Sequence, residues 1–152
     1  MSGDGRSDAS TEKTPVTVID AGVGNLGNLR RALESVGATV EVTTDPDVIR
    51  RGGVLVLPGV GAFKPPREAI RGALEDALRK AVDGGAYLLG ICVGFQLLFE
   101  SSSEFGETDG LGLLPGRVDR LPSTVRLPQI GWNALVDRAD HPLLNGLGDD
   151  PY

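Results

Sequence analysis

Apolar residues along this chain form short continuous runs that alternate with runs spaced three or four positions apart. The runs at 16–20 and 39–43, rich in β-branched residues, and the apolar runs at 54–57 and 86–89 predict four β-strands. The spaced runs between them predict helices, with these residues on their apolar faces: Leu26, Leu29, Leu33 and Val36 in the first, and Ile70, Leu74, Leu78 and Val82 in the longest, which starts at Pro65-Pro66. A shorter helix is expected after Asp45. Strands that alternate with helices and are apolar throughout predict a three-layer α/β domain with a mostly parallel sheet.

The two ends of the chain lack this pattern. Residues 1–14 carry almost no side chain that could be buried, so they are expected to form a disordered polar tail. After Glu100, glycines and prolines interrupt the apolar positions, and only 118–121 and 130–136 are expected to be edge strands. One domain over 15–152 accounts for the rest, and no repeat or second domain is required.

Charge and composition exclude several classes of function. The 152 residues include 21 acidic and 15 basic side chains, and the net charge of −6 argues against nucleic acid or an anionic membrane as partner. The single cysteine cannot form an internal disulfide, and the sequence has neither a signal core nor an apolar stretch that could span a bilayer. We therefore expect a cytoplasmic protein, and nothing in the sequence requires a metal or a cofactor.

That single cysteine, Cys92, stands in the segment Gly-Ile-Cys-Val-Gly at 90–94, between an apolar strand and a helix-like run at 95–99. A sharp strand-to-helix turn between small residues exposes one side chain, as in the nucleophile elbow of hydrolases. The amides at the start of the helix then favour a thiolate. A buried structural cysteine is the alternative, but packing alone would not require glycine both two before and two after it.

Two other glycine-rich turns follow predicted strands. The first, at 22–27, fits G-x-G-x-x-G, and Glu41 stands near the place of a ribose-binding acid in a dinucleotide fold. However, Glu41 falls in the middle of its strand and the pattern is short, so a plain tight turn is the competing interpretation. The second turn, Pro58 to Phe63, is expected at the same sheet edge as Cys92, where its amides could hold an oxyanion. A flexible connection is its alternative.

The chain resembles the class I, or triad-type, glutamine amidotransferases, whose fold is flavodoxin-like. The resemblance rests on the order of three segments: the glycine-rich first turn, Pro58-Gly59-Val60-Gly61, and the run from Gly90 to Leu98. The segment 126–133, Arg-Leu-Pro-Gln-Ile-Gly-Trp-Asn, resembles more narrowly the glutaminase subunits of imidazole glycerol phosphate synthases. The resemblance runs from Val16 to Tyr152. The chain departs from the family pattern in two places: Phe95 stands where methionine is common, and Gln129 where histidine is common.

The resemblance implies a reaction and its residues. Cys92 would attack the side-chain amide of glutamine, ammonia would leave, and water would hydrolyse the thioester to glutamate. The implied roles are an oxyanion hole from Val60 and Val93, and substrate binding by Gly59, Gly61, Gln96 and Glu104. The family passes the ammonia to a barrel-shaped cyclase subunit, which makes imidazole glycerol phosphate and an aminoimidazole carboxamide ribotide in histidine biosynthesis. Pro128, Gln129, Trp132 and Asn133 would lie near that partner, although Trp132 could equally belong to the core.

The catalytic base of this family is not visible in the sequence. Relatives supply it from a His-Pro-Glu segment near the C-terminus, whereas the only histidine here is His141, in a turn-like segment that does not match. The chain stops at Tyr152 and is expected to be a truncated form that is inactive alone. Two alternatives remain open: a glutaminase component of another biosynthetic amidotransferase, and a catalytically silent module that docks on a cyclase.

Overall fold

The computed structural model describes residues 13–129, 131–136 and 139–148. The chain divides into two compact units, one ending at Arg120 and the other beginning at Leu121. The expected tail lies outside the described residues except for its last two positions. Of these, Thr14 is already the first residue of a strand, so the first strand begins earlier than predicted.

A four-stranded parallel sheet is the centre of the first unit, as predicted. Its strands are β1 (Thr14–Ile19), β2 (Ala38–Thr43), β3 (Val54–Gly59) and β4 (Tyr87–Cys92), in the order β2-β1-β3-β4. Val16 pairs with both Val40 and Val54, so β1 and β3 are interior strands. Their continuous apolar sequences follow from burial on both faces.

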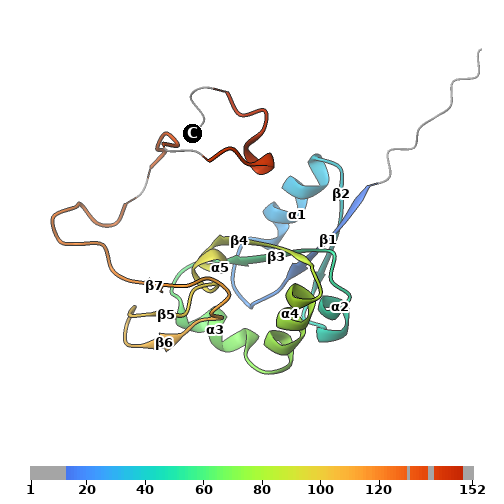
Figure 1. Ribbon diagram of the computed structural model, residues 1–152, viewed down its shortest axis with the longest axis horizontal. Coiled ribbons are helices and arrows are strands. Elements are labelled where there is room, and N and C mark those ends of the chain that lie inside the picture. Colours follow the sequence, from blue (N-terminus) through green and yellow to red (C-terminus); the bar gives the residue numbers. More distant parts are fainter. Residues whose placement is uncertain (1–12, 130, 137–138, 149–152) are drawn as a thin grey trace, which may run out of the picture. The chain divides into compact units, whose positions relative to one another are not determined.

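Helices cover both faces of this sheet (Figure 1). On one face, the leucines of α1 (Leu26–Ser35) pack on alternate residues of β1, β2 and β3. On the other, α2 (Pro46–Arg50), α3 (Lys64–Ile70) and α4 (Ala73–Asp83) cover the intervening residues, among them Ile19, Leu55 and Leu57. The predicted three-layer α/β fold is therefore confirmed.

The predicted long helix after Pro65-Pro66 is wrong, because it is two helices. Gly72 has φ +81°, in the left-handed region, and Arg71 before it is extended with ψ 147°. These two residues separate α3 from α4, yet Ile70 and Leu78 on either side belong to the same core. The apolar spacing continues across the break, which is why the pattern did not reveal it.

A small sheet follows the fourth strand and was not predicted as such. It consists of β5 (Ser101–Ser102), β6 (Thr108–Asp109) and β7 (Arg117–Val118), in the order β6-β5-β7. β7 replaces the longer strand expected at 118–121. Each strand is only two residues long, so no alternating pattern could develop in the sequence.

A partly buried ion-pair cluster ties this small sheet to α3 and α4. Arg67, only 5% exposed, donates from Nε to the carbonyl of Asp109 at 2.8 Å, and its Nη1 lies 2.8 Å from Oε2 of Glu75. Arg79 donates to the other oxygen of Glu75 at 2.9 Å and also to the carbonyl of Leu111. Burial alone would raise the pKa of Glu75, but hydrogen bonds from Arg79 and Arg67 and their charges outweigh it and lower that pKa below its ordinary value.

We predict that Glu75→Gln lowers the free energy of unfolding at neutral pH by about 2–3 kcal/mol, because two arginines lose their buried counter-charge. Since the folded pKa is lowered, the wild-type contribution is present above the ordinary value of 4.5 and is lost as the pH falls through the folded pKa. Denaturant unfolding from pH 7 to pH 2 should therefore show the two proteins converging in acid.

The matched control for this prediction is Glu34→Gln, which removes the exposed partner of Arg30 in α1. An exposed pair of this kind contributes about 0.3–0.5 kcal/mol. Equal losses for the two variants would contradict the role given to Glu75.

The second unit contains one short 3₁₀ helix, η1 (Pro142–Leu144). The strand expected at 130–136 is wrong, since residues 131–136 form none; Ile130 itself lies outside the described residues. Within the described part of the chain, no helix is long and apolar enough to cross a membrane.

Candidate active site

Cys92 ends β4 in a strained backbone conformation. Its φ is 55° and its ψ is −119°, and it is one of two described non-glycine residues with positive φ, Phe105 being the other. Such a conformation costs on the order of 1–3 kcal/mol and persists where the surrounding structure enforces it. The thiol is exposed rather than buried, so the alternative of a structural core cysteine is wrong and the predicted elbow is present.

The two flanking glycines permit the sharp turn. A Cβ on Gly90 would lie 2.5 Å from Cα of Phe95, and one on Gly94 would lie 1.8 Å from the carbonyl oxygen of Leu57. Both distances are far below contact distance, so only glycine fits at either position. The pattern of glycine two before and two after the cysteine therefore has a steric cause.

The glycine loop after β3 lies beside the elbow. Gly59 pairs directly with Cys92 in the parallel register, so the two strands reach the same edge of the sheet, as predicted. Gly59 is buried, and a Cβ there would meet the amide nitrogen of Gly94 at 2.7 Å. Its observed role is this close packing, and a contact with substrate stays a prediction.

The helix after the elbow is shorter than expected. α5 (Val93–Gln96) has four residues, and Leu97 is its C-cap. The prediction of a helix over 95–99 is thus wrong in extent. One turn aligns few peptide dipoles, so the helix contributes less to favouring a thiolate than the sequence suggested.

Cys92 opens onto a pocket of about 680 Å³, within the range of about 300–1,000 Å³ usual for small-molecule sites. The structure brings five predicted residues to it: Gly61, Cys92, Val93, Gln96 and Glu104. Val60, which is half exposed, and Gly59 are not among the lining residues. The oxyanion-hole role of Val60 stays a prediction.

Glu104 connects this pocket to the glycine loop. Its Oε2 accepts a hydrogen bond of 2.8 Å from the backbone amide of Phe63, which ends that loop and is fully buried. The amide of Glu104 itself donates to the hydroxyl of Ser102 at 3.1 Å. The carboxylate therefore fixes the loop on one side while it faces the pocket on the other.

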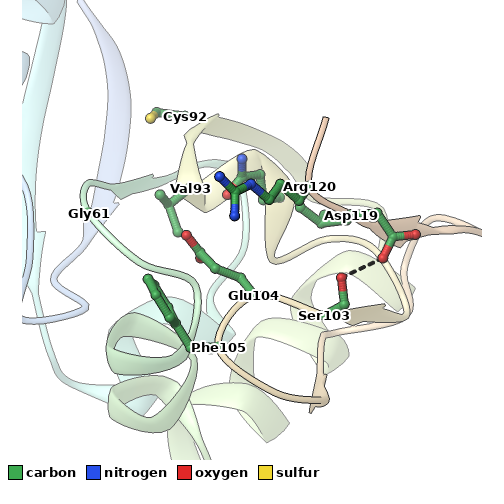
Figure 2. A pocket seen from close by; sticks show the side chains of 10 residues that line it. Gly61, Cys92, Val93, Ser103, Glu104, Phe105, Asp119 and Arg120 are labelled. Carbon is green, nitrogen blue, oxygen red and sulfur yellow. Dashed lines mark hydrogen bonds between the residues drawn. The ribbon is translucent and has the colours of Figure 1, made fainter. Parts of the chain in front are cut away.

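Five further lining residues were missed in the sequence: Ser103, Phe105, Val118, Asp119 and Arg120. All lie in or beside the small sheet, whose two-residue strands gave no signal. The available signal was the pair of charges at 119–120, inside the expected edge strand at 118–121. Ser103 donates to Asp119 at 2.5 Å, and this bond, supported by Arg117, lowers the pKa of Asp119 below its ordinary value (Figure 2).

The predicted partner-facing residues belong to the second unit. Pro128 and Gln129 line a hollow of about 450 Å³, and Asn133 donates weakly to the carbonyl of Gly131 at 3.5 Å. Trp132 is 86% exposed, so the alternative that it is a core residue is wrong. An interface role for these four residues stays a prediction.

His141 is occupied locally. Its Nδ1 accepts a hydrogen bond of 3.1 Å from the amide of Leu143 and so caps η1. This local bond is the observed role of His141, and the expectation that His141 is not the base stays a prediction.

Neither a dinucleotide site nor a metal cluster is supported. Glu41 stands in the middle of β2 opposite Thr17, whereas a ribose-binding acid belongs at the end of a strand. Asp20 accepts from the amide of Gly22, so the first glycine turn is closed by its own strand end. Among the described residues, no group of three or more histidine, cysteine, aspartate or glutamate side chains could hold a metal ion.

Comparison with protein families agrees with this geometry. Residues 17–151 match the model of the family "Glutamine amidotransferase class-I". The chain belongs to that family. Nearly all of both units is included in the match.

Curated relatives of high similarity carry the name "Imidazole glycerol phosphate synthase subunit HisH". The relative from Salinibacter ruber is 47% identical over 144 residues, covering 90% of this chain and 66% of the relative. Those from Symbiobacterium thermophilum and Moorella thermoacetica are 47% and 46% identical, covering 87% and 91% of this chain and 63% and 67% of theirs. The chain thus spans about two thirds of the length of these relatives.

A solved structure supports the fold alone. A protein of Listeria monocytogenes EGD-e described as a peptidase E superposes with a TM-score of 0.51 at 19% identity. The match covers 60% of this chain and 53% of that one. The shared feature is the α/β architecture, and nothing about activity follows from it.

Proposed function

We propose that this chain is the glutaminase part of an imidazole glycerol phosphate synthase, which hydrolyses glutamine to glutamate and passes the ammonia to a cyclase subunit. The observation that carries the proposal is the placement of Cys92. An exposed cysteine stands in a strained elbow, opposite Gly59 in the sheet register, and opens onto a pocket that it shares with Gln96 and Glu104. The names of the relatives supply the choice of reaction.

In this proposal Cys92 attacks the side-chain amide carbon of glutamine. The carbonyl oxygen becomes an oxyanion held by backbone amides from Val93 and from the loop at Val60 and Gly61. The carbon–nitrogen bond breaks, ammonia leaves with an added proton, and water hydrolyses the thioester to release glutamate. Gln96 and Glu104 hold the substrate, with the carboxylate facing its ammonium group.

The general base is proposed to come from outside these 152 residues. A cysteine amidase needs a group that takes and returns protons, and the only imidazole of the chain is held in the cap of η1. The docking partner is proposed to be the cyclase, contacted by the segment 128–133. We place the protein in the cytoplasm, where its single thiol stays reduced.

We predict that the 152-residue chain releases essentially no ammonia from glutamine, with or without a cyclase. General acid–base catalysis is worth about 10²–10⁴-fold, and the chain has no base to supply it. Fusing onto Tyr152 the part of the Salinibacter ruber relative that lies beyond its match should restore ammonia release, and a cyclase subunit should increase it.

The controls for this experiment separate the alternatives. Turnover by the unfused chain near the rate of the fusion would contradict the missing base, and His141→Ala would then show whether His141 is responsible. Stimulation of the fusion by an anthranilate-type synthase partner instead of a cyclase would favour another biosynthetic amidotransferase. Binding to the cyclase without turnover by the fusion would favour a silent docking module.

A further inference from the structure

We propose that Arg120 binds the α-carboxylate of the substrate, so that Arg120 and Glu104 together select a free, zwitterionic amino acid. The inference rests on the proposed function and extends it. Neither the sequence pattern nor the family resemblance drew attention to Arg120. It follows the small strand β7 and lines the same pocket as Cys92.

The pocket is lined by one cation, Arg120, and by two acidic residues, Glu104 and Asp119. Figure 2 shows the Arg120 side chain extending into the pocket from the end of β7, on the side toward which the Glu104 carboxylate also points. An α-amino acid carries an ammonium and a carboxylate on one carbon. A carboxylate and a guanidinium that face one space therefore form a site of matching charge, and a guanidinium can bind a carboxylate with two parallel hydrogen bonds.

Arg120 is free to bind an anion, whereas its acidic neighbours are engaged. Asp119 accepts from Ser103 at 2.5 Å and from Arg117 at 3.1 Å, so its charge is satisfied away from Arg120. Glu104 uses Oε2 for the amide of Phe63. Among the described residues, Arg120 itself makes no hydrogen bond or ion pair with another side chain.

Backbone pairing in the small sheet sets the positions of Arg120 and Glu104 relative to each other. Arg120 is two residues past Val118, which pairs with Ser102 in the small sheet, and Glu104 is two residues past Ser102 on the neighbouring strand. Both charged side chains therefore follow paired positions of one parallel pair of strands. The ends of parallel strands meet at the same sheet edge, so the two charges are placed together by backbone pairing.

The test uses alkylation of Cys92 in the full 152-residue chain, which needs no catalytic base. The main probe is the chloroketone analogue of glutamine: the thiolate sulfur forms a bond to the chloromethyl carbon, and chloride leaves with the bonding pair. Two matched probes lack one charge each, namely the aminochloroketone without the carboxylate and chlorolevulinate, which lacks the ammonium. Iodoacetamide reports the reactivity of the thiol alone.

We expect Arg120→Ala to slow labelling by the full chloroketone at sub-saturating concentration by about 10–100-fold, the size of a charge-assisted hydrogen bond. Labelling by chlorolevulinate should fall similarly, and labelling by the aminochloroketone and by iodoacetamide should change less than about twofold. Arg120→Lys should recover part of the loss. Glu104→Gln should show the mirror pattern, slowing the probes that carry the ammonium and sparing chlorolevulinate.

The matched control is Arg30→Ala, which removes an equal charge from the exposed pair with Glu34 in α1, outside the pocket lining. It should leave all four rates nearly unchanged. If Arg120→Ala slows no probe, or slows all four equally, the carboxylate-binding role is wrong although the glutamine site stands. If wild-type Cys92 reacts no faster with the full chloroketone than with iodoacetamide, the proposed function fails, and this inference with it.

Discussion

Replacing Cys92 by serine is expected to abolish both alkylation by the glutamine-shaped chloroketone and ammonia release by the fusion protein. The chain has no second cysteine, so the substitution removes its only thiol. A serine hydroxyl is a much weaker nucleophile than a cysteine thiolate at neutral pH. Loss of the nucleophile of a hydrolase triad costs on the order of 10⁶-fold in kcat, so the remaining turnover should be below detection. Mass spectrometry of the treated protein and an ammonia assay measure the two effects.

The control for this variant is Cys92→Gly, which should be equally inactive but more stable than wild type. Glycine adopts φ 55° without steric cost, and the exposed thiol contributes little to the core. Relief of strain worth about 1–3 kcal/mol, less about 1 kcal/mol for the greater freedom of glycine in the unfolded chain, leaves a gain of about 1 kcal/mol. A glycine variant less stable than wild type would contradict the strained elbow, and labelling or turnover that survives in Cys92→Ser would contradict the nucleophile.

The central sheet could be predicted from the sequence because its interior strand β3 is buried almost throughout and the other strands repeat the same alternation with helices. Apolar runs such as 54–57 have no other stable place than the interior of a parallel sheet. The shared sheet edge of Cys92 and the loop after β3 followed from the two strands being parallel, whereas the register that sets Gly59 opposite Cys92 came from the structure. The fold and the elbow at Cys92 were therefore predictable from strong, local patterns.

The small sheet and half of the pocket could not be predicted, for a physical reason. Strands of two residues are stabilised by contacts distant in sequence, such as the bond from Arg67 to the carbonyl of Asp109. In the sequence, Arg67 and Arg120 resemble ordinary exposed surface residues. Neither the burial of Arg67 nor the place of Arg120 in the pocket lining could therefore be predicted. The break at Gly72 was hidden in the same way, because the core on either side is continuous.

The charged side chains in and near the small sheet serve two purposes: one group stabilises the sheet, and the other lines the pocket. Arg67 and Arg79 neutralise Glu75 beneath the small sheet, whereas Glu104 and Arg120 at its surface face the pocket. The partly buried pairs hold the sheet in place, and the strand pairing of Ser102 with Val118 then positions the two pocket charges. The stability of the ion-pair cluster and the specificity of the pocket are thereby linked through one short sheet.

Gly94→Ala is expected to be the most destabilising single-methyl change at the elbow. The added Cβ would lie 1.8 Å from the carbonyl oxygen of Leu57 and 2.7 Å from its carbonyl carbon, both backbone atoms of the central strand β3. A side chain could rotate away, but this backbone can move only by separating β3 from the elbow. We expect a loss of about 4 kcal/mol in the free energy of unfolding, beyond the usual 1–3 kcal/mol for overpacking, or failure to fold.

The matched control is Gly27→Ala in α1, where the nearest atom to a new Cβ is the flexible Arg31 guanidinium at 4.0 Å. Alanine in a helix is about 0.5–1 kcal/mol more favourable than glycine, so this variant should be slightly stabilised. Thermal unfolding of the two variants beside wild type should therefore move the melting temperature in opposite directions, down by about 10 °C or more for Gly94→Ala and up by a few degrees for Gly27→Ala. A Gly94→Ala protein that melts within about 2 °C of wild type would mean that the elbow does not press against β3, and the steric account of the glycine pattern around Cys92 would fail.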